Sequence, residues 1–337
     1  MKVLFIGGTG IISSACTEIA IEKGMEVFHL NRGMTDKDHV PKEVTTIHAD
    51  IRNGNEAEAK LKGHHFDAVV DFIAFEPQHI EQDIRLFRDR TAQYVFISTA
   101  SAYQKPPEKL PITEKTPLWN PYWEYSQKKI FCEKLLKSEA KKSGFPFTIV
   151  RPSHTYNYKK VPAIGGYTVL HRMLKGQPVV LHGDGTSVWT LTYHRDFAVG
   201  LIGLLGNRAA IHEDFHITSD EWLTWNGIYK ILASELGVEP KTVHIPSEII
   251  ALYDKEMGAN LLGDKSHSMI FDNSKIKKFV PEFQAKTPFS KGATEIVQWF
   301  RENTLYTGPD AAVENWMNRL IDDWEGFKSF RGKVNRL

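Results

Sequence analysis

The sequence predicts an α/β fold built on a doubly wound parallel sheet. Three observations carry this prediction. Short apolar runs alternate with helical stretches through the first half of the chain, and a glycine cluster directly follows the first apolar run. In addition, 42% of the 337 residues are hydrophobic and 25% are charged, as expected for a soluble globular protein. Continuous apolar strands that alternate with helices are typical of a parallel sheet covered on both faces.

The predicted elements of the first half follow from this alternation. Buried strands are expected at 2–6, 26–30, 45–48, 68–73, 93–98 and 146–150. Helices are expected between them at 12–23, 77–90 and 122–143. The parallel arrangement requires such helical crossovers, because two parallel strands cannot be joined by a tight turn.

The domain organisation is predicted from a change in this rhythm. Beyond Arg151-Pro152 the alternation loosens, and the helical stretches 226–236 and 294–303 are separated by loops. We predict a first domain over residues 1–160, a smaller lobe mainly over 161–325, and a basic tail over 326–337. Segments around 190–225 are expected to return to the first domain.

Composition excludes several classes of function. The net charge of +1 gives no bulk attraction to nucleic acid or to a membrane surface. No stretch approaches the length of a transmembrane helix, and the apolar start is too short for a signal peptide. Cys16 and Cys132 fall in predicted helices without metal-ligand spacing, so we expect neither a disulfide nor a metal site. These features predict a cytoplasmic protein.

The glycine cluster Gly7-Gly-Thr-Gly10 lies between the first strand and the first helix. Glycines there permit a tight turn and let backbone N–H groups approach a pyrophosphate at a helix N-terminus. Ser13 stands where the common dinucleotide signature has a third glycine, and an ordinary strand-to-helix turn is the alternative interpretation. We predict dinucleotide binding. The residues expected to contact the cofactor here are Gly7, Thr9, Gly10, Ile11 and Ile12.

The ends of the second and third strands bear on which dinucleotide is bound. A carboxylate after the second strand would bind the adenosine ribose and repel a 2′-phosphate, but this chain has Asn31-Arg32. Because Arg pairs bidentately with phosphate, the residues favour NADP(H), with NAD left open. Asp50-Ile51 after the third strand suits a contact to adenine. Asp50 is equally well explained as a carboxylate that caps the next turn.

Tyr125 and Lys129 place a phenol and an ammonium four residues apart on a predicted helix. Side chains at this spacing share a helical face. The positive charge of Lys129 favours the phenolate of a Tyr whose pKa is ordinarily about 10. Such a Tyr can exchange a proton with an alcohol or a carbonyl. Taken alone, a pair at this spacing is more often solvated helix surface.

With these motifs in order, the chain resembles the extended short-chain dehydrogenase/reductase family, in particular its NAD-dependent epimerase/dehydratase group. The resemblance runs from Lys2 to about Trp299 and implies a Rossmann-type NAD(P)-binding domain followed by a smaller C-terminal substrate-binding lobe. The motifs that carry it are Gly7-Gly-Thr-Gly10, Ile97-Ser-Thr-Ala-Ser-Ala-Tyr103, Tyr125-x-x-x-Lys129, Arg151-Pro152 and Gly183-Asp-Gly185.

The resemblance implies specific roles. Thr99 would hydrogen-bond the substrate oxygen, and Tyr125 would transfer the proton. Lys129 would hold the nicotinamide ribose and lower the pKa of the Tyr, while hydride passes between the substrate carbon and the nicotinamide. Without the Tyr-Lys pair, Thr99 would be explained as a strand-end hydroxyl that satisfies local backbone.

Two departures from the family pattern narrow the activity. Dehydratases of this family carry Asp-Glu after the catalytic Thr, whereas this chain has Ala100-Ser101, so dehydration is not expected. The Arg that grips a substrate diphosphate in the family corresponds to Trp189, which has one N–H donor and no charge. The usual Asn after Arg-Pro-x corresponds to His154. We expect Ser101, His154 and Trp189 to face the substrate, although Trp is also a common core residue.

The sequence therefore predicts an NAD(P)-dependent oxidoreductase or epimerase that acts by hydride transfer on a hydroxyl or carbonyl of a sugar or sugar-nucleotide-like substrate. Two alternatives stay open. One is an NADPH-dependent reductase of a small non-nucleotide carbonyl compound. The other is a nucleic-acid-binding protein on the same scaffold, since the extended family includes chloroplast stem-loop-binding proteins. The expected partner is a small, carbohydrate-like molecule rather than a membrane or nucleic acid, and a homodimer is left open.

Overall fold

The computed structural model describes residues 1–34 and 40–334, with side chains described as far as residue 329. The chain divides into two compact units. The first comprises Met1–Thr155, Thr192–Asp220 and Phe271–Lys286, and the second comprises Tyr156–Leu191, Glu221–Ile270 and Thr287–Leu337.

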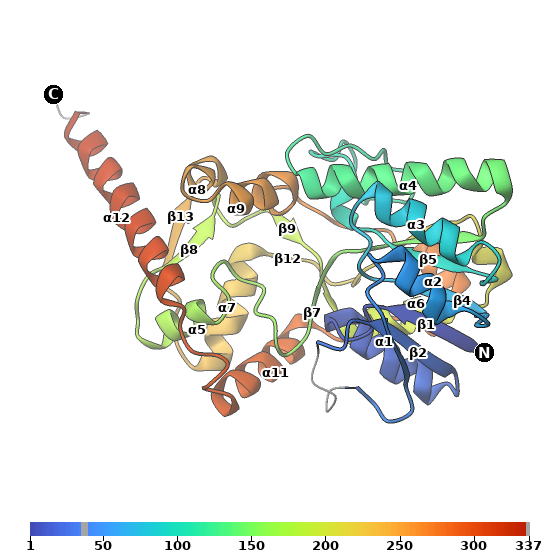
Figure 1. The fold of residues 1–337 in the computed structure, drawn as a ribbon. Coiled ribbons are helices and arrows are strands. Elements are labelled where there is room, and N and C mark those ends of the chain that lie inside the picture. Colours follow the sequence, from blue (N-terminus) through green and yellow to red (C-terminus); the bar gives the residue numbers. More distant parts are fainter. Residues whose placement is uncertain (35–39, 335–337) are drawn as a thin grey trace. The chain divides into compact units, whose positions relative to one another are not determined.

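The first unit contains a seven-stranded sheet in the order β11-β6-β5-β4-β1-β2-β3 (Figure 1). Every pair of neighbouring strands is parallel. The predicted doubly wound parallel sheet is therefore confirmed, with a seventh strand at the β6 edge. Its strands are β1 (Lys2–Ile6), β2 (Glu26–Asn31), β3 (Thr45–His48), β4 (Ala68–Asp71), β5 (Tyr94–Ile97), β6 (Phe147–Pro152) and β11 (Asp214–Ile217).

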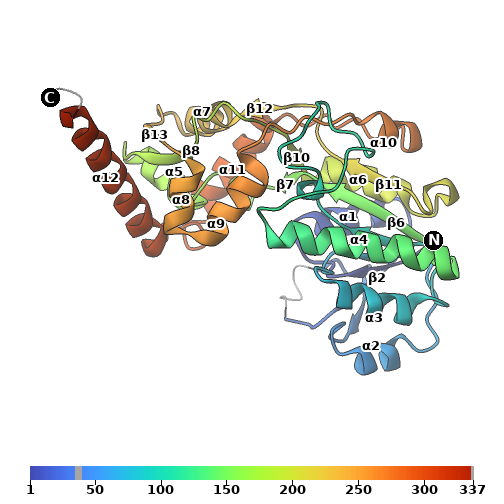
Figure 2. The ribbon, with the colours of Figure 1, turned by 90° about the horizontal axis from the view of Figure 1, so that it is seen from above.

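Helices cover both faces of this sheet (Figures 1 and 2). Val3 and Phe5 of β1 join the core beneath α1 and α6, whereas Leu4 and Ile6 join the core beneath α3 and α4. This alternation follows from the two-residue period of a strand. The helices of the unit are α1 (Ile11–Glu22), α2 (Gly54–Leu61), α3 (Pro77–Phe87), α4 (Glu124–Ser143), α6 (His194–Leu204) and α10 (Ser274–Phe279), with short 3-10 turns at Ala100–Ala102 and Arg208–Ala210.

Two elements of this unit differ from the sequence-based expectation. Helix α2 was not predicted, because its eight residues bury only Ala57 and Leu61 and leave little apolar periodicity. The segment Phe271–Lys286 lies in the first unit rather than in the predicted second lobe, because α10 packs on β11 and α6.

The second unit combines helices with short strand pairs. A parallel pair joins β8 (Val179–His182) to β13 (Thr242–Ile245), and an antiparallel pair joins β9 (Val188–Trp189) to β12 (Leu223–Thr224). Where the chain passes between the units, β7 (His154–Tyr156) pairs with β10 (Leu191–Tyr193). The helices are α5 (Tyr167–Leu174), α7 (Trp225–Leu236), α8 (Ser247–Tyr253), α9 (Lys255–Asn260), α11 (Phe289–Glu302) and α12 (Ala311–Val334), with a π-helical turn at Leu261–Lys265.

The last helix extends into the range expected as a basic tail, 326–337. Helix α12 continues through Val334, and residues 335–337 lie outside the described part of the chain. Met317, Leu320 and Ile321 are buried at helical spacing, so the start of α12 packs on α8 and β8.

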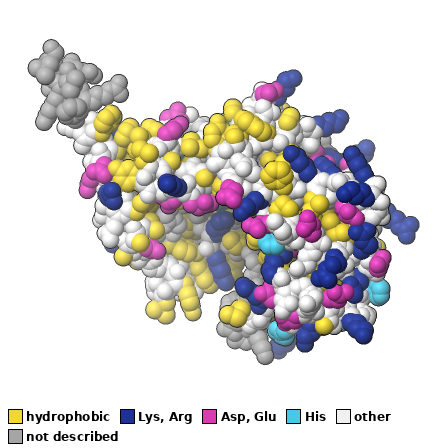
Figure 3. Space-filling model, turned by 45° about the horizontal axis from the view of Figure 1, so that its top comes forward, with side chains coloured by type: hydrophobic (Ala, Val, Ile, Leu, Met, Phe, Trp, Pro, Cys, Tyr) yellow, Lys and Arg dark blue, Asp and Glu magenta, His cyan; other side chains and the backbone are white. Residues whose placement is uncertain are grey.

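The surface shows no single-sign field on the face drawn in Figure 3. Lys and Arg side chains are frequent there but are interspersed with Asp and Glu. Among the described residues, no helix combines the length and apolarity needed to cross a membrane.

A buried ion pair attaches α4 to the sheet. Arg151 on β6 binds Glu133 on α4 through two bonds, at 2.9 Å from Nε to Oε1 and 2.6 Å from Nη2 to Oε2, and both side chains are 1% exposed. Ser98 Oγ also donates to Glu133 Oε1 at 2.6 Å. Arg151 completes its bonding with Asp214 on β11 at 2.6 Å. Loss of Arg151 would leave Glu133 as an uncompensated buried charge, whereas loss of Glu133 would leave Arg151 with Asp214 as its only counter-charge.

We expect Glu133→Gln to lower the free energy of unfolding by about 2 kcal/mol, because Arg151 loses its fully buried counter-charge and keeps only the partly exposed Asp214. The matched control is Glu139→Gln on the same helix. Glu139 pairs with the more exposed Arg88 at 2.6 Å, and we expect a loss below about 1 kcal/mol. Urea unfolding followed by circular dichroism measures both variants. Equal losses would contradict the structural role assigned to the buried pair.

Candidate active site

The glycine loop after β1 is closely packed at two of its glycines. Gly7 has φ of +80°, and a Cβ there would lie 2.5 Å from Ile73 Cγ2. A Cβ on Gly8 would lie 2.5 Å from the His29 ring. His29 is held by Thr17 of α1 at 2.8 Å, so Gly8 lets α1 approach β2 closely. The close helix-strand packing expected at a third glycine is thus supplied by Gly8.

Ser13 takes a defined part in this loop. Its Oγ donates to Gly7 O at 2.8 Å and accepts from Gly10 N at 2.7 Å. Gly10 is the N-cap residue of α1, so this hydroxyl closes the turn at the helix N-terminus. The serine at the third-glycine position therefore stabilises the loop rather than weakening it.

A cavity of about 370 Å³ opens beside this loop at the carboxyl ends of the strands, entirely within the first unit. This edge is where parallel α/β sheets bind their ligands. The predicted cofactor residues that line it are Gly7, Thr9, Asn31, Arg32, Asp50 and Ile51. The predicted Gly10, Ile11, Ile12 and Lys129 do not line this cavity. The two isoleucines begin α1 directly after the loop.

Residues at the ends of β2 and β3 form one end of the cavity. Asn31 Oδ1 accepts from Gly33 N at 3.1 Å, and Arg32 is exposed. Asp50 Oδ1 accepts from Arg52 N at 2.9 Å, so Asp50 both caps its turn and lines the cavity. The two interpretations of Asp50 are therefore compatible.

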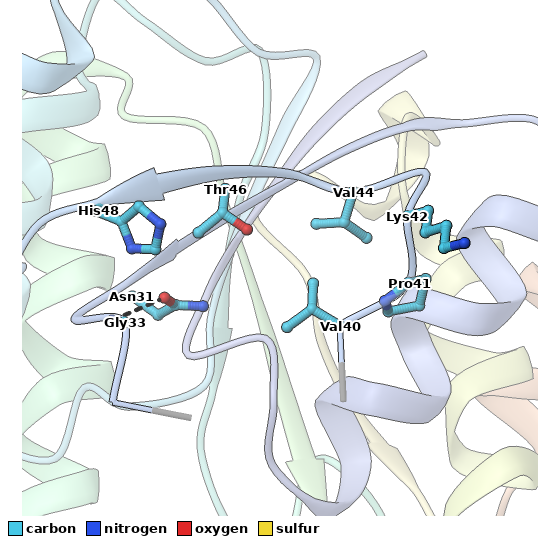
Figure 4. Close-up of a pocket in the computed structure, with 8 residues that line it drawn as sticks. All are labelled: Asn31, Gly33, Val40, Pro41, Lys42, Val44, Thr46 and His48. Atoms are coloured by element: carbon cyan, nitrogen blue, oxygen red, sulfur yellow. Dashed lines mark hydrogen bonds between the residues drawn. The ribbon is translucent and has the colours of Figure 1, made fainter. Parts of the chain in front are cut away.

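A second pocket, of about 220 Å³, lies next to Asn31 (Figure 4). Figure 4 shows Asn31 and His48 at one end of it and Lys42 at the other. Its wall between these residues is formed by Val40, Pro41, Val44 and Thr46. Asn31 thus lines both cavities.

Lys129 lies on the buried face of α4 and is 1% exposed. Its Nζ donates to Ala74 O at 2.6 Å and to Ile97 O at 2.7 Å, which joins the helix to the ends of β4 and β5. The same Nζ lies 4.7 Å from the Phe75 ring centroid. Burial lowers the pKa of Lys129 from 10.5 to about 8. In the predicted Tyr125-Lys129 pair, Lys129 is therefore buried and does not belong to a solvated helix surface.

Tyr125 lies one turn before Lys129 and is partly buried. Lys129 Nζ lies 5.8 Å from the centroid of its ring. The ring also packs against Trp123 and Phe75, at centroid distances of 4.8 and 6.3 Å. Because Phe75 lines the cavity, it links the phenol of Tyr125 to the predicted cofactor site.

Thr99 begins a chain of hydroxyl groups. Its Oγ1 lies 2.9 Å from Ser101 Oγ, which lies 2.7 Å from Ser126 Oγ on α4. Thr99 Oγ1 also accepts from Ser101 N at 3.2 Å as it caps the 3-10 turn. Ser101 is 3% exposed, its hydroxyl bonds those of Thr99 and Ser126, and its contact with substrate stays a prediction. Its location fits a residue that orients Thr99.

The other two predicted substrate residues lie in different units, and each is described in its own. His154 is partly buried on β7. Trp189 is 3% exposed in the second unit, where it stacks on Trp225 at a centroid distance of 5.9 Å. Its indole N–H has no hydrogen-bond partner among the described residues. Contact of either residue with substrate stays a prediction.

Sequence reasoning missed seven residues that line the cavity, and three of them, Arg52, Phe75 and His79, carry charged, aromatic or hydrogen-bonding side chains. Arg52 directly follows the noted Asp50-Ile51, so its position was a usable signal. Phe75 and His79 follow β4. Parallel sheets bind ligands at the carboxyl ends of their central strands, so the position of these two residues was a second usable signal. Within the described part of the chain, no group of His, Cys, Asp and Glu is arranged to hold a metal ion.

The fold and the cavity define a Rossmann-type α/β protein whose ligand cavity opens at the carboxyl edge of its sheet. The chain belongs to the NAD dependent epimerase/dehydratase family, whose model matches residues 3–218. This membership bears out the resemblance to the extended short-chain dehydrogenases/reductases.

Individual relatives span different parts of the chain. The chloroplast stem-loop binding protein of 41 kDa b from Arabidopsis thaliana is 27% identical over 259 residues, which cover 72% of this chain and 65% of that protein. A UDP-glucose 4-epimerase from Lactobacillus helveticus is 29% identical over 168 residues, 45% of this chain and 51% of that protein. The chain thus spans less than two thirds of either relative.

A third relative and a solved structure match more completely. The 2′-dehydrokanamycin reductase of Streptomyces kanamyceticus is 23% identical over 304 residues, 89% of this chain and 84% of that protein. The structure of UDP-glucuronic acid 4-epimerase from Bacillus cereus, in complex with UDP-glucuronic acid and NAD, has a TM-score of 0.73 and 18% identity. It covers 90% of this chain and 99% of that one, and it shows a shared fold.

The lowered pKa of Lys129 predicts a pH dependence of stability. Between about pH 8 and 10.5 the unfolded chain holds the Lys129 proton and the folded protein releases it. The free energy of unfolding that Lys129 contributes therefore rises with pH across this window. We therefore expect the free energy of unfolding of the protein, minus that of Lys129→Met, to rise with pH across this window. Urea unfolding of both proteins from pH 7 to 11 measures this difference.

Lys128→Met is the matched control for this measurement. The hydrogen bonds of Lys128 with Glu76 and then Glu124 raise its pKa, so its contribution falls as pH rises. A flat Lys129 difference would contradict the burial of Lys129, and a rise in the Lys128 difference would contradict the bonds assigned to Lys128.

Proposed function

We propose that the protein is an NAD(P)-dependent oxidoreductase or epimerase that transfers hydride at a hydroxyl or carbonyl carbon of a sugar or sugar-nucleotide-like substrate. The observation that carries this proposal is that Phe75, which lines the cavity, contacts both Tyr125 and Lys129. Family membership supports the same class of chemistry.

The residues present fit a dinucleotide. The glycine loop brings backbone to the cavity at Gly7, where no side chain is tolerated, and Arg52 Nη1 is a buried donor without a partner among the described residues. The bound nicotinamide would supply the site that accepts or gives hydride. Gly7, Thr9 and the start of α1 would hold the diphosphate, with Asp50 and Ile51 at the adenine.

The chain's own groups would handle the proton. Thr99 would donate to the substrate oxygen, and Tyr125 would give or take its proton. Lys129 has a pKa near 8, so its ammonium is mostly charged at neutral pH and favours the phenolate of Tyr125. Ser101 and Ser126 would hold the Thr99 hydroxyl in place.

Two finer features belong to the proposal. NADP(H) is the preferred cofactor, since Asn31 and Arg32 replace the carboxylate that repels a 2′-phosphate. Dehydration is not part of the activity, because Ala100 and Ser101 are buried and neither is an acid or base of the required strength.

A second candidate is a reductase of a small non-nucleotide carbonyl compound. Trp189 is buried against Trp225 at the position where sugar-nucleotide enzymes of the family have a diphosphate-binding Arg. The relative named 2′-dehydrokanamycin reductase, which matches most of the chain, supports this candidate. Stoichiometric consumption of NADPH distinguishes it from an epimerase, which shows no net cofactor turnover.

Nucleic-acid binding is the remaining alternative, and the chloroplast stem-loop relative keeps it open. The interspersed charges of Figure 3 count against it, because nucleic-acid binding requires a concentrated basic face. Salt-dependent RNA binding together with no affinity for NAD(H) or NADP(H) would overturn the proposed function.

Tyr125→Phe should reduce turnover by at least about a hundredfold, because it removes the proton-transferring hydroxyl. Binding of NAD(P)H, followed by fluorescence, should stay within about threefold. The matched control is Tyr122→Phe, which changes an exposed phenol three residues earlier and should leave turnover unchanged. The assay monitors NAD(P)H absorbance and product stereochemistry with UDP-sugars and with free sugar ketones. Full activity of Tyr125→Phe would remove Tyr125 from its proposed role.

Arg32→Ala should weaken NADP(H) binding by about tenfold, because a charge-assisted bond to the 2′-phosphate is lost. Binding of NAD(H), which has no 2′-phosphate, should change by less than about threefold. Calorimetric titration measures both affinities, with Arg85→Ala on α3 as the control. Equal loss for both cofactors would mean that Arg32 does not distinguish them.

A further inference from the structure

Arg52 reaches across the cavity wall from the turn between β3 and α2. Its backbone N–H is held by Asp50 Oδ1 at 2.9 Å, and its Nη2 donates to Ile73 O after β4. The side chain therefore lines the cavity from a fixed position between two strand ends. Its second terminal nitrogen, Nη1, is buried and has no partner among the described residues.

The charge of Arg52 has no carboxylate at ion-pair distance among the described residues, and Glu76 and Asp83 interact with it only at longer range. The described residues offer it hydrogen bonds only to the carbonyl of Ile73, and it forms no ion pair with a described carboxylate. A guanidinium keeps its charge at any pH that proteins tolerate. Removing it from water costs free energy unless an anion and hydrogen-bond acceptors replace the water. Neutral acceptors such as adenine nitrogens would satisfy Nη1 without matching the charge.

His79 provides a second donor on the same wall. Its Nδ1 accepts from the backbone N–H groups of Phe75 at 3.1 Å and Glu76 at 3.3 Å. Partial burial, and then the charge of Arg52, lower the pKa of His79. The ring is therefore neutral at pH 7 and carries its proton on Nε2, which makes Nε2–H a donor.

We propose that Arg52, assisted by His79, forms a phosphate-binding subsite of the dinucleotide cavity, in addition to Arg32. This inference rests on the proposed function, because it assumes that the cavity binds a dinucleotide. The phosphate comes from one of two sources, the 2′-phosphate of NADP(H) or the 5′-diphosphate that NADP(H) and NAD(H) share. In either case its oxygens accept from Nη1, while Nη2 keeps its bond to Ile73 O.

Three probes separate the two sources in calorimetric titrations of the full chain: adenosine, ADP, and adenosine 2′,5′-bisphosphate. In Arg52→Met, which keeps the length of the stem, we expect at least one phosphorylated probe to bind about tenfold or more weakly. Adenosine should change by less than about threefold. Loss confined to the 2′,5′-bisphosphate identifies the 2′-phosphate, and loss with both phosphorylated probes identifies the 5′-phosphates.

Two further variants separate ligand binding from a structural role. Arg52→Lys keeps a cation that can bond Ile73 O but has no second guanidinium nitrogen, so we expect a partial loss with the same probe. Arg85→Met removes an exposed Arg of α3 and should change nothing. Weakening of adenosine equal to that of the phosphorylated probes would assign Arg52 a structural role and overturn the inference.

The same titrations distinguish this inference from the proposed function. Unaltered phosphate binding by Arg52→Met, in a protein that binds NADP(H) or NAD(H), overturns the Arg52 subsite alone. Failure of the unmodified protein to bind any of the nucleotides or dinucleotides overturns both.

Discussion

The attachment of α4 to the sheet by two buried charges is the constraint on which the candidate site depends. Lys129 bonds the carbonyls at the ends of β4 and β5, and Glu133, one turn later, bonds Ser98 and Arg151. Tyr125 precedes Lys129 at the same four-residue spacing, so all three share one helical face. Because Lys129 finds its two carbonyl acceptors and Glu133 its Arg151 partner only in this register, sliding or rotation of the helix would leave both buried groups without partners. The position of the phenol follows from that register.

The segment after β4 joins this helix to the cavity. Asp71 Oδ1 accepts from the backbone N–H groups of Ile73 and Ala74, at 2.6 and 2.8 Å. The carbonyls of the same two residues then receive Arg52 from the cavity side and Lys129 from the α4 side. Hence one short backbone segment fixes both a cavity-lining cation and the Lys beside the phenol. A displacement of this segment would alter both contacts together.

The sequence was sufficient for features that depend on local pattern and insufficient for those that depend on long-range contacts. The strands were predictable because both faces of a parallel sheet are buried, and the cavity residues were predictable because they directly follow strands. The bond from Arg52 to Ile73 was not predictable, because no local pattern indicates a side chain that reaches an element 21 residues away. The environment of Trp189 was not predictable either, because the sequence does not distinguish an indole at a ligand-binding position from one stacked in a core. Ser101 was expected at the substrate, but its neighbour across space, Ser126, engages its hydroxyl.

The two departures from the family pattern favour the same kind of substrate. Ala100 and Ser101 are buried, so a change of rotamer cannot bring an acid or base to the place where dehydratases have one. Trp189 is buried in the other unit, and its indole carries no charge to bind a diphosphate. The two departures are independent of each other, because each position is buried in its own unit. Both changes remove charged groups that the family pattern places at the substrate, whereas Thr99 and Tyr125, the groups proposed for proton transfer, are retained. This combination is the reason why a reductase of a small non-nucleotide carbonyl compound is proposed as the second candidate function.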